Sequence, residues 1–150
     1  MYRRLFRGIG PCAALLLALP GCGSDELDSP TAKKLKSLSS LYLEFVAGRN
    51  GEGPKDEKHF KMFMAAVPEQ SLSAMRLQRG DLEGLFTSER DGQPFEIVYG
   101  LRITRINGEE APVVAHEKTG KDGKKLVGFA NGKVDLVSED RLRELLAAKQ

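Results

Sequence analysis

The sequence predicts a single α+β domain, in which N-terminal helices pack on an antiparallel β-meander and a short helix follows at the C-terminus. Apolar residues recur at every third or fourth position between residues 30 and 67, which is the spacing of one helix face. From residue 95 the β-forming residues alternate at every second position, and Asn131-Gly132 is a strong hairpin signal. Helices and strands in separate stretches of chain are typical of α+β proteins.

The first long helix is predicted to begin at Ser29 and to end at Gly48. Ser29 is suited to cap the helix, Pro30 to its first position, and Gly48 to its end. One side of this helix is expected to be buried, with the residues Leu35, Leu38, Leu41, Tyr42, Phe45 and Val46. Lys33, Lys34 and Lys36 lie off this stripe, where a solvated face explains them and contact with anionic headgroups is the alternative.

A second helix is predicted from Asp56 to Val67, after a loop over 50–54. Its apolar side carries Phe60, Phe63, Met64 and Val67, and Pro68 ends it. Residues 69–77 are expected to form a short helical turn with Leu72 and Met75. Residues 78–93 lose the periodicity and contain three glycines, which indicates a wrapped loop.

The β-meander is predicted from strands at 95–99, 101–106 and 113–117, with turns at Asn107-Gly108 and over 119–124. A two-residue turn at Asn131-Gly132 would pair Phe129 with Val134 and Val127 with Leu136, placing all four on one face.

Ser138 is expected to cap the last helix. Glu139 and Asp140 lie at the positive end of its dipole, and the apolar side carries Leu142, Leu145 and Leu146.

The N-terminus has the three parts of a secretory signal. Arg3, Arg4 and Arg7 precede an apolar run over 12–19, which is shorter than the roughly 20 residues that span a bilayer. We therefore divide the chain into a signal over 1–21, a tether over 22–29 and one domain over 30–150. An ordinary signal peptide with an incidental cysteine is the alternative.

The segment Leu19-Pro20-Gly21-Cys22 resembles the lipobox of bacterial lipoproteins. The resemblance implies cleavage between Gly21 and Cys22 and acylation of Cys22, so that acyl chains hold the protein on a membrane facing the periplasm. Gly23 follows the cysteine, whereas an Asp there often signals retention at the inner membrane. The resemblance thus implies transfer to the outer membrane.

Composition narrows the partners and the chemistry. Removing the three signal arginines from 23 basic residues leaves 20 against 21 acidic ones, a net charge of −1, so nucleic acid is not an expected partner. Cys12 leaves with the signal and Cys22 is acylated, so a folded domain without disulfides is expected.

We expect no catalytic residues, no metal site and no cofactor. His59 and His116 are the two histidines, and neither has a metal-ligand spacing. His116 could act as a base, but its neighbour Glu117 points to the opposite strand face. Asp91 and Asp122 are interpreted as turn residues, and Arg79-Gly80-Asp81 as a chance match to an adhesion tripeptide.

The chain also resembles type IV pilin-like and pseudopilin domains, including small exported proteins of planctomycete type. The segment Tyr42–Pro54 is similar to the junction after the pilin helix, Arg90–Phe95 to a pseudopilin turn, and Phe129–Val134 to a terminal hairpin. This resemblance implies a long helix followed by a β-meander.

The sequence therefore predicts a lipid-anchored cell-envelope protein that acts as a structural or protein-interaction module, with an envelope protein as partner. A small periplasmic hydrolase, or a protein that binds a ligand or peptidoglycan, is the alternative.

Overall fold

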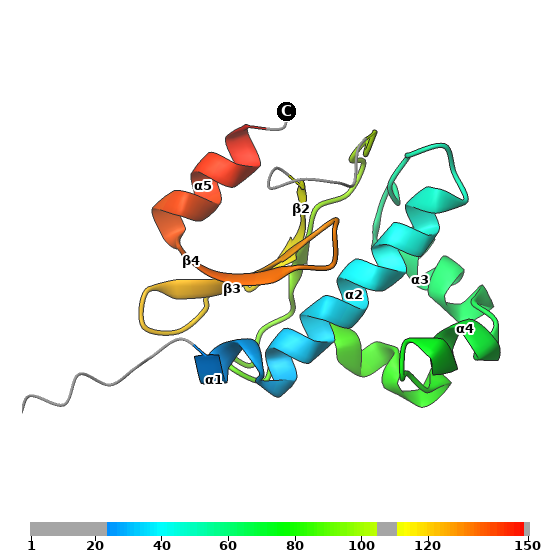
Figure 1. The fold of residues 1–150 in the computed structure, drawn as a ribbon, viewed down its shortest axis with the longest axis horizontal. Coiled ribbons are helices and arrows are strands. Elements are labelled where there is room, and N and C mark those ends of the chain that lie inside the picture. The colour runs from blue at the N-terminus through cyan, green and yellow to red at the C-terminus, as the bar shows by residue number, and fades with distance from the viewer. Residues whose placement is uncertain (1–23, 105–110, 149–150) are drawn as a thin grey trace, which may run out of the picture.

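The computed structural model describes residues 24–104 and 111–148 and confirms the α+β prediction (Figure 1). The helices are α1 (Ser24–Leu27), α2 (Pro30–Ala47), α3 (Glu57–Ala66), α4 (Glu69–Ala74) and α5 (Glu139–Ala147), with the 3₁₀ helices η1 (Arg79–Asp81) and η2 (Glu83–Phe86). The strands are β1 (Glu96–Ile97), β2 (Val113–His116), β3 (Lys124–Phe129) and β4 (Val134–Ser138).

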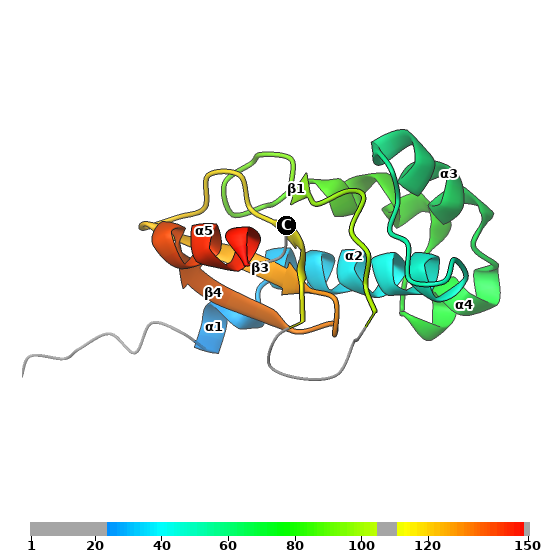
Figure 2. The ribbon, with the colours of Figure 1, turned by 90° about the horizontal axis from the view of Figure 1, so that it is seen from above.

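The four strands form an antiparallel sheet in the order β1-β2-β3-β4, with α2 and α5 on opposite faces (Figure 2). Successive residues of β3 show this arrangement. Leu126 packs in the cluster that includes the α2 side chains, and Val127 packs with Leu142 of α5. Both β3 residues are fully buried, because each face of the sheet is covered.

The helix α2 has the ends that its sequence predicts. The Ser29 hydroxyl accepts a hydrogen bond from the amide of Ala32 at 3.2 Å, Pro30 is the first residue, and Gly48 follows the last one. The six apolar residues expected on its inner side are all buried. The buried stripe lies against both the sheet and α3, which makes α2 the centre of the fold.

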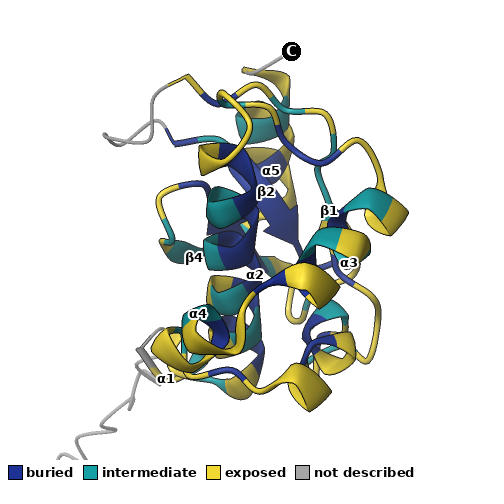
Figure 3. Ribbon diagram, turned by 90° about the vertical axis from the view of Figure 1, so that its right-hand side faces the viewer, coloured by how far each residue is buried: buried dark blue, intermediate teal, exposed yellow. Residues whose placement is uncertain are grey.

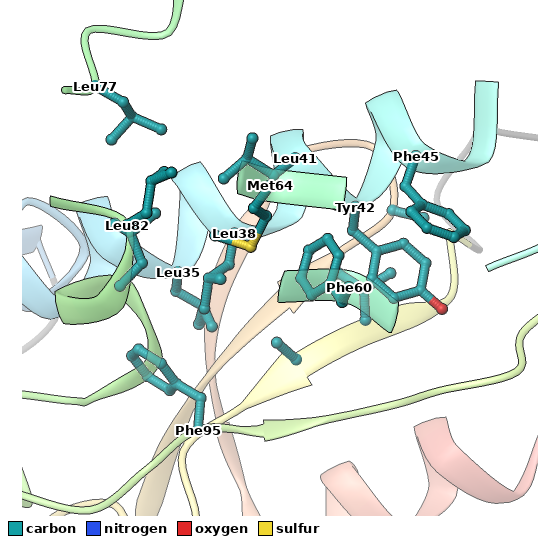
Figure 4. Close-up of a cluster of buried hydrophobic side chains, with 14 of the residues drawn as sticks. Leu35, Leu38, Leu41, Tyr42, Phe45, Phe60, Met64, Leu77, Leu82 and Phe95 are labelled. Carbon is teal, nitrogen blue, oxygen red and sulfur yellow. The ribbon is translucent and has the colours of Figure 1, made fainter. Parts of the chain in front are cut away.

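The helix α3 packs across the second half of α2. It begins one residue after the predicted start, because Asp56 is its cap and accepts the amide of His59 at 2.7 Å. Phe60 and Met64 project toward α2 (Figure 4), and the ring of Phe60 meets that of Tyr42 edge-on at 5.7 Å. The outer surfaces of α3 and α4 are largely exposed, so this pair of helices covers the core from one side only (Figure 3).

The loop predicted over 78–93 is more ordered than expected, because it contains η1 and η2. Arg79 donates to the carbonyl of Ala65, in the last turn of α3, and to that of Val67, the residue that follows the helix. The Arg79-Gly80-Asp81 triplet therefore helps to close a helix end within the fold.

The meander differs from its prediction at two strands. Over 95–99 only Glu96–Ile97 forms a strand, and residues 101–104, the described part of the strand predicted over 101–106, do not join the sheet. Instead the backbone of Arg102 forms an isolated antiparallel β-bridge with that of Glu52, and the Ile103 amide donates to the Gly51 carbonyl at 2.7 Å. The alternating residues predict a strand of the meander, but their partner is the loop after α2. The predicted turn at Asn107-Gly108 lies outside the described residues.

The predicted register of the last hairpin is wrong by one residue. β3 pairs Gly128 with Val134 and Leu126 with Leu136. Of the turn residues only Gly132 has a positive φ, of +78°, and the loop has three residues, Ala130 to Gly132, closed by the Gly132 amide on the Phe129 carbonyl. This geometry is a type I turn followed by a left-handed residue.

The shift moves side chains to the other face. Val134 and Leu136 pack toward α2, whereas Val127 and Phe129 pack toward α5. Because both faces of β3 are buried, the hydrophobic pattern did not determine the register.

The last helix is confirmed. The Ser138 hydroxyl accepts the amide of Arg141 at 3.3 Å, and Leu142 is buried beneath the sheet.

Candidate functional site

The predicted lipidation and cleavage residues, Cys22 and Gly21, lie outside the described residues. The described chain begins at Ser24 with α1. Part of the predicted tether over 22–29 is thus helical, and the structure differs locally from the expectation of a plain linker. The attachment of α1 to the domain is therefore the structural feature that lies closest to the expected anchor.

Arg90 fastens α1 to the rest of the protein. Its guanidinium lies 3.0 Å from the Glu26 carboxylate on one side and 2.6 Å from the Glu117 carboxylate on the other. It also donates to the carbonyls of Lys121, in the turn between β2 and β3, and of Lys124, the first residue of β3, each at 3.2 Å. One side chain therefore joins α1, the sheet and this turn.

Glu117 is a fully buried carboxylate at the end of β2. Besides Arg90, it accepts a hydrogen bond from the Ser88 hydroxyl at 2.9 Å and one from the Leu126 amide at 2.8 Å. A buried charge is tolerated when it is paired and hydrogen-bonded in this way. Both carboxylate oxygens already accept hydrogen bonds from the protein, so the arrangement suits a structural role and not proton transfer.

Asp91 holds the same turn from outside. One carboxylate oxygen accepts the amides of Thr119 and Gly120, and the other accepts the amide of Gln93. Partial burial raises the pKa of Asp91, but these amides and the Ser88 hydroxyl outweigh it and the net pKa is lowered. This agrees with the interpretation of Asp91 as a turn residue.

His116 is buried, with 5% of its surface exposed, and it lines a cleft of about 360 Å³ between β1 and α5. Its Nδ1 lies 2.9 Å from the Glu117 carbonyl, which is a hydrogen-bond acceptor for a ring N–H. Nε2 is 3.6 Å from the Glu96 carboxylate. The other lining side chains are apolar, with Ile97, Val113 and Leu145 among them.

The structure does not bring the two histidines together. His59 stacks edge-on against Phe45 at 5.0 Å, in the helical part of the molecule. Within residues 24–104 and 111–148, no three His, Cys, Asp or Glu side chains are placed to hold a metal ion. Of the helices that the structure describes, none has the length and apolar character that a bilayer span requires.

The Glu26–Arg90–Glu117 group was not predicted from the sequence. Its members are 64 and 27 residues apart along the chain, so no local spacing connects them. The one available signal was Glu117 itself, a charged residue that directly continues a strand of buried residues.

Comparisons with protein-family models, with curated proteins and with solved structures find no match to this chain. The lipoprotein and pilin-like resemblances both stay predictions.

Proposed function

We propose that this protein is a lipid-anchored component of the bacterial cell envelope, whose domain is held close to the membrane and acts through contacts with another envelope protein. The acyl chains on Cys22 supply the anchor, and the protein faces the periplasm, with the outer membrane favoured by Gly23.

The docking of α1 carries this proposal. Glu26 follows Cys22 by four residues and is bound to Arg90, which is itself bound to buried Glu117. A chain that only needed a loose linker would not require a buried guanidinium at this point. The connection instead supports a domain with a fixed orientation relative to its anchor, as a module that presents one face to a partner requires.

The test is intact-mass measurement and membrane fractionation of the native protein beside the Cys22→Ser variant. We expect the native protein to begin at Cys22, to carry acyl mass and to fractionate with membranes, and the variant to lose both properties. A native protein that begins at Met1 without acyl mass would contradict the anchor. Crosslinking in intact envelopes should then recover one consistent protein partner.

A second candidate function is ligand binding at the His116 cleft. The Nε2 atom and the Glu96 carboxylate at one end of an apolar cleft suit a small molecule with an apolar body and a hydroxyl group. None of the described residues that line this cleft carries a hydroxyl or thiol nucleophile, which favours binding over hydrolysis. The test is ¹⁵N NMR of the His116 ring during titration with 1-octanol, in which an unchanged Nε2 signal would exclude this class of ligand.

A further inference from the structure

A second cleft, of about 690 Å³, lies between the first half of α2 and the end of α4 and is lined by cations. Lys33, Lys36 and Arg76 contribute three exposed positive charges, and Ser37 and Ser40 contribute hydroxyls. Within the described part of the chain, none of the three cations forms an ion pair, and no acidic residue lines the cleft. The exposed acids Asp25 and Asp28 precede α2 and do not line it.

Two of these cations occupy positions that local structure disfavours. Arg76 has a φ of +59°, at the left-handed position after α4 where glycine is the usual residue. The amide of Leu77 donates to the Leu72 carbonyl at 2.9 Å and closes this helix end around it. Lys33 lies in the first turn of α2, where a positive charge opposes the helix dipole, and that turn holds no acid.

Residues that break local rules are expected at functional sites. Here the two lie on different elements and line the same cleft, so a common ligand accounts for both. Three cations without a lining carboxylate fit a phosphate group.

The position of the cleft suggests where the phosphate comes from. Figures 2 and 3 both place α1 and α4 on the same side of α2, so the cleft lies on the side where the chain enters the domain. We infer that Lys33, Lys36 and Arg76 bind the phosphate of an anionic phospholipid headgroup in the membrane that holds the anchor. This inference rests on the proposed function, because the anchor brings the cleft to the lipid.

The test uses the acylated protein in vesicles. Ser73 is exposed on α4 beside the cleft, and a Ser73→Cys variant gives one free thiol for an environment-sensitive dye. In vesicles that contain phosphatidylglycerol we expect dye emission at shorter wavelength than in pure phosphatidylcholine. The shift should be lost in the Lys33→Gln, Lys36→Gln, Arg76→Gln triple variant. It should be retained in a Lys55→Gln, Lys58→Gln, Lys118→Gln triple variant, which has the same charge change elsewhere.

Equal emission in the two kinds of vesicle would overturn the inference, as would a shift that survives in the cleft variant or disappears in the control. A response to inorganic phosphate in phosphatidylcholine vesicles, without one to phosphatidylglycerol, would overturn the lipid as the source. If the cleft variant fails to fold, Arg76→Gly replaces it, since glycine suits this position, and it should reduce the shift. Failure of the anchor is measured separately. In that case the protein would carry no acyl mass and would not float with phosphatidylcholine vesicles.

Discussion

The guanidinium of Arg90 lies 2.6 Å from the carboxylate of Glu117, and neither side chain is more than 8% exposed. The pair lies where the sheet, α1 and the β2–β3 turn meet, so its removal should affect all three. Replacing Arg90 leaves the Glu117 carboxylate buried without a counter-charge, and replacing Glu117 removes the buried partner of Arg90, whereas replacing both leaves no buried charge.

We expect Glu117→Ala to lower the free energy of unfolding by about 3–5 kcal/mol, because the buried guanidinium of Arg90 then keeps only the partly exposed Glu26 carboxylate as a counter-charge. The double variant Glu117→Met, Arg90→Met should recover much of this loss. Urea unfolding measures both. Glu144→Ala, which breaks the exposed pair with Arg141, is the control and should change stability by no more than about 0.5 kcal/mol. Equal effects of Glu117→Ala and Glu144→Ala would show that burial of the pair is unimportant.

Glu26→Gln should release α1 while leaving the domain folded. Glu26 is partly exposed and bonds to only one side of Arg90, so the loss of overall stability should be small. Hydrogen exchange of the α1 amides should become faster, with the sheet amides unchanged. Asp25→Asn, at an exposed position of the same helix, should leave exchange as in the native protein; acceleration by both variants would argue against a specific role for Glu26.

Gly128→Ala should destabilise the protein by about 1–3 kcal/mol through overpacking. A Cβ at this position would lie 2.5 Å from the Ser39 hydroxyl oxygen and 3.0 Å from Cγ of Leu35, so β3 and α2 would have to separate. Gly84→Ala is the matched control, because nothing lies within 4 Å of its added Cβ and its φ is not positive. Thermal unfolding should shift downward for the first variant only.

Arg76→Gly should raise the free energy of unfolding by about 1 kcal/mol, because glycine adopts a positive φ without steric strain. The same replacement at Ser73, within α4, should lower it by about as much, since glycine disfavours a helix interior. Opposite signs in urea unfolding would establish that the arginine is locally strained. A destabilised Arg76→Gly variant would instead mean that the side chain packs favourably.

Asp91 should contribute to stability in a pH-dependent way. Its pKa is lowered in the folded protein from an ordinary value of 3.8, so its contribution is complete above that pH and is lost as the pH falls through the folded pKa. The stability difference between native protein and Asp91→Asn should therefore shrink below about pH 4. A pH-independent difference for Asp91→Asn would contradict the assignment.

Local signals predicted the parts of the fold that local physics determines. Ser29 and Pro30 mark a helix start whatever the rest of the chain does, and Ser138 does the same for α5. The predicted β3–β4 register is wrong because Asn131-Gly132 is compatible with turns of two and of three residues. Both faces of the sheet are covered, so no polar face distinguishes the two registers.

The candidate site could be predicted only in part. Arg90 meets Glu26 and Glu117 through tertiary packing, for which one sequence contains no spacing rule. Arg76 was likewise not distinguishable, since the strain at this residue becomes visible only when its φ is known. The sequence places Lys33 and Lys36 off the apolar stripe of α2, but no spacing connects them to Arg76 across the cleft.

The docking of α1 also limits how far the domain can reach. A polypeptide extends by at most about 3.6 Å per residue, so the four steps from Cys22 to Glu26 span no more than about 14 Å. With Glu26 held by Arg90, a domain anchored as we propose would stay in close proximity to the bilayer surface. Any protein that engages it must come to the lipid surface, and a target attached deep in the periplasm would be out of range.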